Sequence, residues 1–113
     1  MRSLFVLTAI FFSISAMAQS DSVKSTVYSW KNLKPVKEET RERRQVLEGY
    51  TTHLQKLEIH ATTLEPGKAP HPPHVHADEE ELIIVKEGKL SVTINGNTVE
   101  LGAGSVAIAM PGD

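Results

Sequence analysis

The stretch HPPHVHADEEE, residues 71–81, holds three of the five histidines of this 113-residue chain together with four carboxylates. His74 and His76 are one residue apart, so in an extended backbone both imidazoles leave the same face, about 7 Å apart at their origins. Two such side chains can converge on one ion with each nitrogen about 2 Å from it. Neighbouring prolines restrict the backbone and lower the entropy lost on ordering it. The pattern predicts a metal site rather than a merely solvated loop.

A carboxylate is the natural third ligand. An unbroken strand from His74 would favour Asp78 or Glu80 by parity. A turn at residues 77–78 would interrupt this alternation of side chains. Glu81 would then be the first residue on the strand face that continues through Ile83 and Val85. Periodicity leaves these arrangements open. The acidic candidates are Asp78, Glu79, Glu80 and Glu81.

Two further histidines lie near this stretch or before it. His71 could substitute as a ligand, but its place before two prolines favours the surface of a loop. His60 lies on the polar phase of an alternating segment, which favours a surface or rim position over a ligand role.

Strands are the elements expected to position these residues. Leu57, Ile59 and Ala61 alternate with polar residues, which predicts a half-buried strand that ends at the turn Glu65-Pro66-Gly67. The runs ELIIVKEG, from residue 81, and GSVAIAM, from residue 104, read as further strands. Because no sustained helical period follows the N-terminal segment, we expect an all-β antiparallel sandwich or barrel.

The dipeptide Asn95-Gly96 is the strongest local structure marker in the chain. A type I′ turn needs positive φ at both central residues, and Asn-Gly satisfies this best. A two-residue loop fixes the register of the hairpin that it joins. The expected pairs are Ile94 with Asn97, Val92 with Val99, Leu90 with Leu101, and Ser91 with Glu100 on the other face.

The N-terminal half has two recognisable segments. Arg2, the apolar run Leu4–Ile14 and the small residues around Met17 are typical of a signal peptide cleaved before Gln19, because the run is shorter than the ~20 residues of a membrane span. We therefore expect an exported protein, periplasmic or secreted, without a stable membrane anchor.

The later segment KPVKEETRERRQVLEG mixes charges of both signs, which favours a solvated loop or short helical turn over an arginine-based anion site.

Composition limits the kinds of partner and the sources of stability that we expect for this chain. A net charge of −2 provides no basic field for nucleic acid. The chain has no cysteine, so no disulfide supports it in an oxidising compartment. A mature domain of about 95 residues buries only about two thirds of its unfolded surface, which is consistent with a homodimer.

The stretch from Gly67 to Gly88 resembles the first motif of the cupin superfamily: Gly, about five residues, His-x-His, three or four residues, Glu, six residues, Gly. Here six residues separate Gly67 from His74, four separate His76 from Glu81, and six separate Glu81 from Gly88. The resemblance implies a small antiparallel cupin-type β-barrel (a double-stranded β-helix or jelly roll). It also implies a divalent metal, Fe, Mn, Ni or Zn, held by His74, His76 and Glu81.

The second cupin motif reads Gly, five residues, Pro-x-Gly, two residues, His, and its match stops early. Six residues separate Gly104 from Pro111, Gly112 follows at once, and the sequence stops at Asp113. The resemblance therefore places the fourth ligand, a histidine, and the closing strands beyond Asp113, so we expect a barrel that is incomplete at its C-terminus. The expected organisation is a signal peptide at 1–18, an N-terminal arm or edge strand at 19–50 and a cupin domain at 51–113.

Three functions fit these residues. The first is a metal-dependent enzyme of dioxygenase, isomerase or decarboxylase type acting on a small molecule, with the metal as Lewis acid or oxygen activator. The second is a non-catalytic cupin that binds a sugar, a metal or another small ligand, and the third is a stress or storage protein with a degenerate site. No residue stands out as a general acid or base among His60, Thr62, Thr93 and Tyr50.

Overall fold

The computed structural model describes residues 21–113, which divide into two compact units, one ending at Pro70 and one spanning His71–Asp113. The segment expected to be a signal peptide, residues 1–18, lies outside the described residues. The expected boundary between residues 50 and 51 stays a prediction. Each unit is described by itself below.

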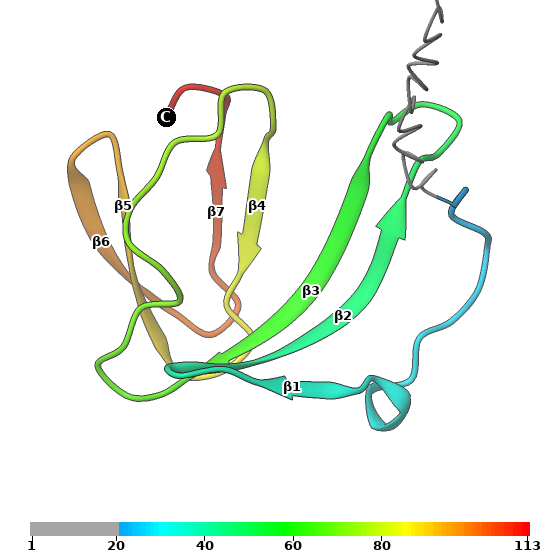
Figure 1. Ribbon diagram of the computed structural model, residues 1–113. Coiled ribbons are helices and arrows are strands. Elements are labelled where there is room, and N and C mark those ends of the chain that lie inside the picture. Colours follow the sequence, from blue (N-terminus) through cyan, green and yellow to red (C-terminus); the bar gives the residue numbers. More distant parts are fainter. Residues whose placement is uncertain (1–20) are drawn as a thin grey trace, which may run out of the picture. The chain divides into compact units, whose positions relative to one another are not determined.

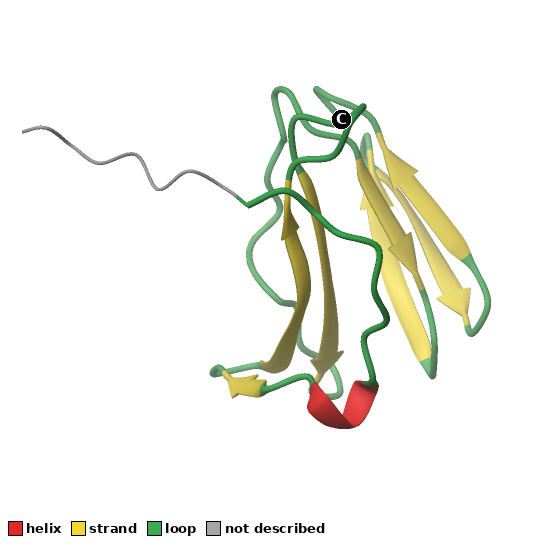
Figure 2. Cartoon of the chain, turned by 90° about the vertical axis from the view of Figure 1, so that its right-hand side faces the viewer, coloured by secondary structure: helices red, strands yellow, loops and turns green. Residues whose placement is uncertain are grey.

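The described chain is almost entirely β, as predicted, with one short 3₁₀ turn (Figures 1 and 2). All pairings between strands are antiparallel, and they form three separate sheets, of three, two and two strands, rather than a closed barrel. No helix within residues 21–113 has the length and hydrophobicity that a membrane span requires. The elements are η1 (Trp30–Asn32), β1 (Pro35–Lys37), β2 (Arg41–Gly49), β3 (Leu57–Leu64), β4 (Glu81–Ile84), β5 (Lys89–Ile94), β6 (Asn97–Gly102) and β7 (Val106–Ala109).

The first unit is the sheet β1-β2-β3, and its central strand corrects an expectation. The mixed-charge segment is not a loop or helical turn: residues 41–49 form β2, which pairs with β3 from Arg41 opposite Leu64 to Gly49 opposite Leu57. The strand tolerates these charges because each of its arginines forms an ion pair with a carboxylate. The ion pairs are Arg41 with Glu38, Arg43 with Glu58, and Arg44 with Glu42.

Arg44 ties the 3₁₀ turn to this sheet. Its guanidinium carbon lies 4.7 Å from the ring centroid of Trp30, and Nη1 donates to the carbonyl of Leu33 at 2.7 Å. A guanidinium stacked on an indole face gains both packing and electrostatic attraction. The long side chain therefore holds residues 30–33 against the strand.

The second unit contains two two-stranded sheets: β4-β7, whose strands are separated in sequence by the other pair, and the hairpin β5-β6. The β5-β6 register matches all four predicted pairs, and both central turn residues have positive φ, 51° at Asn95 and 75° at Gly96. In β4 and just after it, Glu81, Ile83 and Val85 are less exposed than Leu82 and Ile84, and Val85 is only 6% exposed. The inward face of β4 is thus the one that Glu81 begins.

Candidate metal centre

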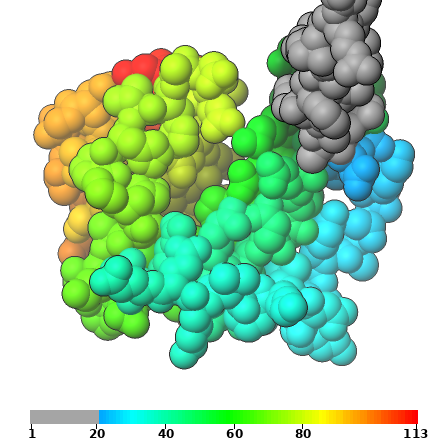
Figure 3. Space-filling view, viewed as in Figure 1, coloured from blue at the N-terminus to red at the C-terminus, as the bar shows by residue number. Residues whose placement is uncertain are grey.

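The histidine-rich loop, residues 71–80, precedes β4 and has no regular secondary structure. Its atoms are seen in yellow-green at the surface in Figure 3. The chain bends at Ala77 and Asp78, which is the phase-resetting turn that one of the two predicted arrangements required. Because the bend breaks the parity from His74, Glu81 becomes the acid that enters the inward face of β4.

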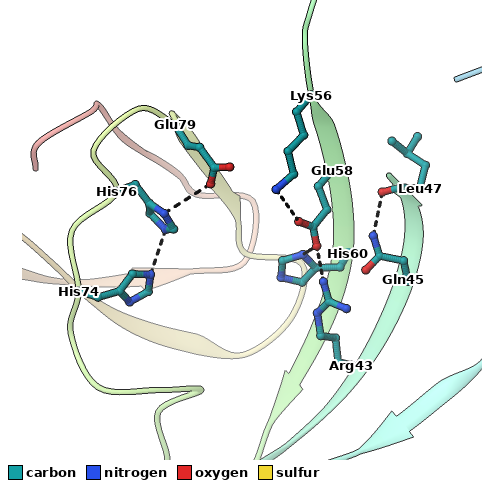
Figure 4. Close-up of polar contacts among 9 residues, drawn as sticks. All are labelled: Arg43, Gln45, Leu47, Lys56, Glu58, His60, His74, His76 and Glu79. Atoms are coloured by element: carbon teal, nitrogen blue, oxygen red, sulfur yellow. Dashed lines mark hydrogen bonds and ion pairs between the residues drawn. The ribbon is translucent and has the colours of Figure 1, made fainter. Parts of the chain in front are cut away.

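His74 and His76 face one another across this loop (Figure 4). Their Nε2 atoms are 3.0 Å apart, and the two rings meet edge to face with centroids 4.5 Å apart. Two nitrogens that lie about 2.1 Å from one ion, at right angles, are about 3.0 Å from each other. A separation of 3.0 Å is thus compatible with two ligands of one ion at right angles, and it is also the length of an N–H···N hydrogen bond.

The opposite nitrogen of each ring has an acceptor of its own. His74 Nδ1 lies 3.4 Å from the carbonyl oxygen of Pro72, and His76 Nδ1 lies 3.5 Å from Oε2 of Glu79. An acceptor at Nδ1 favours the tautomer that carries its proton there and leaves the lone pair on Nε2. With both rings in that tautomer, two lone pairs face each other, an arrangement that a cation stabilises.

The backbone of His76 is fixed by the far end of the sequence. The Gly112 N–H donates to the His76 carbonyl at 2.8 Å, and Asp113 N–H donates to the Met110 carbonyl at 3.1 Å in the turn that contains Gly112. Asn95 in the hairpin turn donates to the Asp113 carboxylate at 2.8 Å. The turn at residues 110–113 thus links the histidine-rich loop with the β5-β6 hairpin.

Glu81 is the member of the predicted set that is least well placed. Its Oε2 lies 3.9 Å from His76 Nε2, and its side chain is 45% exposed. Within residues 21–113 no group of three histidine or acidic side chains converges closely enough to hold an ion. The structure therefore brings the two histidines together, and the role of His74, His76 and Glu81 as metal ligands stays a prediction.

The other histidines occupy different positions. His71 packs its ring edge to face on His74, with centroids 4.3 Å apart, and its Nδ1 lies 3.0 Å from the Pro72 carbonyl. His60 lies on an exposed face of β3, in the other unit, where its Nδ1 is 3.4 Å from Glu58. The contact of Glu79 with His76 could not be read from the sequence, because strand parity does not apply across a bend.

The second unit also contains an open apolar pocket of about 250 Å³. Its walls come from β5, β6 and β7, and its lining contains no ionisable side chain. The residues are Val92, Ile94, Asn97, Val99, Leu101 and Ala107. Such a surface can receive the apolar part of a small molecule.

Comparison with known proteins agrees with the predicted family and with the strands. Residues 60–113 match the family model described as the cupin domain. Neither the curated proteins nor the solved structures gave a match. The matched span contains His74, His76 and Glu81 at motif spacing, together with the four strands β4 to β7. Residues 60–113 of this chain therefore form a domain of the cupin superfamily.

Proposed function

We propose that this cupin binds one divalent metal ion through His74, His76 and Glu81. The observation that carries the proposal is the 3.0 Å separation of the two Nε2 atoms, each on a ring whose Nδ1 has an acceptor. Glu79 would then orient His76, the part that carboxylates play behind histidine ligands in metal sites.

Imidazole and carboxylate ligands together suit Fe, Mn, Ni or Zn. When bound, such an ion polarises a ligand oxygen or activates water or O₂. The chain's own residues would orient the two imidazoles, through the Pro72 carbonyl behind His74 and the Glu79 carboxylate behind His76. We therefore propose a small-molecule function of dioxygenase, isomerase or decarboxylase type.

Metal removal tests the proposal directly. We expect the purified protein to carry about one ion per chain, measured by mass spectrometry, and to lose it on treatment with a chelator. At a metal concentration 100 times the Kd, binding adds about 2.7 kcal/mol to the free energy of unfolding. Restoring Zn²⁺, Mn²⁺, Ni²⁺ or Fe²⁺ to the stripped protein should raise its midpoint in thermal unfolding followed by circular dichroism. Identical midpoints with and without every metal would contradict the proposal.

A non-catalytic cupin that binds a small ligand is the second candidate. The apolar pocket favours it, because the lining offers shape and apolar contact but no side chain that could transfer a proton. Both candidates involve a small-molecule partner and neither involves nucleic acid. A homodimer is a further proposal, supported by exposed apolar side chains on one face of the β4-β7 sheet: Leu82, Ile84, Val106 and Ile108.

We propose further that the protein is exported to the periplasm or secreted. The support is the sequence pattern of residues 1–18, with its basic start, apolar run and small residues before Gln19. Expression with the N-terminal segment intact should give a mature protein in the extracytoplasmic fraction whose N-terminal sequence begins at Gln19. An uncleaved chain in the cytoplasmic fraction would contradict export.

A further inference from the structure

The β2-β3 sheet carries a second polar cluster, made of Arg43, Glu58 and His60 (Figure 4). Glu58 and His60 are two residues apart in β3, so their side chains leave the same face. Arg43 lies opposite Thr62, the next residue of β3 on that face. The register of the two strands therefore brings these side chains together on one surface.

One carboxylate is the centre of the cluster. Glu58 Oε1 accepts a hydrogen bond from Arg43 Nη2, and the same oxygen lies 3.4 Å from His60 Nδ1. Its other oxygen, Oε2, lies 3.9 Å from Lys56 Nζ. Arg43 and His60 both contact Oε1 of Glu58, so their side chains lie close to each other. One small molecule can therefore contact both of them.

The side chains of this cluster are accessible. Arg43 is 27% exposed, Glu58 29% and His60 37%. An ion pair at such a position contributes about 0–1 kcal/mol to folding. Stability alone therefore does not account for two further basic groups around one carboxylate. A ligand that uses the outward edges of Arg43 and His60 gives these groups a function.

Glu58 determines which hydrogen-bonding groups of Arg43 and His60 remain available to a ligand. A carboxylate at Nδ1 favours the proton there, so His60 Nε2 presents a lone pair and accepts a hydrogen bond. Arg43 contacts Glu58 through one nitrogen, and a guanidinium has five N–H donors in a fork that matches a second carboxylate. The cluster thus offers a cationic fork beside a neutral acceptor.

We propose that Arg43 and His60 form a binding site for a small 2-hydroxycarboxylate. Arg43 binds the carboxylate, His60 Nε2 accepts a hydrogen bond from the hydroxyl group, and Glu58 is the positioning residue for both. Glu48 lies opposite Glu58 and adds a second negative charge to this face, so a monoanion fits better than a phosphate or another polyanion. The inference uses the β2-β3 sheet alone and goes beyond the metal site.

A matched pair of probes tests the hydroxyl contact. Lactate and propionate share a carboxylate and carbon chain and differ by the 2-hydroxyl group. Each is titrated into the purified, metal-stripped protein at constant ionic strength and about pH 8, where free imidazole is neutral. Binding is followed by the NMR signals of the His60 ring and the Arg43 guanidinium. We expect lactate to bind on the order of fivefold more tightly, which corresponds to one neutral hydrogen bond.

Variants separate the two contacts. His60→Ala should leave propionate affinity unchanged and bring lactate down to it, whereas Arg43→Gln should remove binding of both acids, with Arg43→Lys restoring part of it. Arg41→Gln is the control, because Arg41 lies on the same strand and pairs with Glu38 instead. Backbone amide spectra report whether each variant keeps the sheet. Equal affinity for both acids, no response at His60, or equal losses in Arg41→Gln and Arg43→Gln would each overturn the proposal.

Discussion

Replacing both His74 and His76 by alanine is expected to abolish metal binding. In metal sites, loss of a carboxylate that only orients a ligand costs 10-fold to 100-fold in affinity, so loss of two direct ligands should cost more than about 100-fold. Because these side chains are partly or largely exposed, the chain should still fold. Metal titration by calorimetry, with bound metal after dialysis measured by mass spectrometry, provides the comparison with the wild-type protein.

Three single variants sharpen this test. His53→Ala removes an exposed histidine from the other unit and should leave metal affinity unchanged. His71→Ala asks whether the ring that packs on His74 is itself a ligand. Glu79→Gln should lower affinity within the 10-fold to 100-fold range expected for an orienting carboxylate. Equal metal content in the double variant and the wild-type protein would rule out the metal proposal.

Replacing Gly96 by valine is expected to destabilise the second unit by about 2 kcal/mol or more. Gly96 has φ of 75°, a conformation that costs an L-residue about 1–2 kcal/mol and a β-branched residue more. No atom would crowd the new side chain, so the cost is one of backbone conformation rather than of collision. The free energy of unfolding in urea measures the change.

Gly102 supplies the matched control, because it ends β6 without positive φ and has equally open surroundings. Gly102→Val should change stability far less than Gly96→Val. Distortion of the turn should also reach the histidine-rich loop, because Asn95 holds Asp113 and the Gly112 N–H holds the His76 carbonyl. Similar losses of stability in the two variants would show that the turn conformation is not what matters.

The sequence predicted the structure best where neighbouring residues determine the backbone conformation. The β5-β6 register followed from two residues, Asn95 and Gly96, because a type I′ turn leaves no freedom in the pairing of its strands. The turn at Glu65 to Gly67 was predicted on the same grounds and is present, with Lys68 N–H donating to the Glu65 carbonyl.

The interpretation of residues 41–49 was wrong for a complementary reason. A run of alternating charges looks solvated when read along the chain, but β3 lies beside β2 and supplies Glu58 for Arg43. Pairing between distant strands overrides local composition, because strand preference depends on the neighbours across the sheet. The Arg43–Glu58–His60 cluster could not be predicted before that pairing was known.

By itself, the sequence determined the all-β class and the cupin motif spacing, and it predicted His74 and His76 as ligands, since these depend on residue types at short separations. Tertiary structure decided between the two phases open to the acids, because the bend at residues 77–78 places Glu81 at the head of the inward face of β4. It also decided which acceptors stand behind the two imidazoles. Hydrogen bonds of that kind depend on how a folded loop turns back on itself, and no periodicity along the chain encodes them.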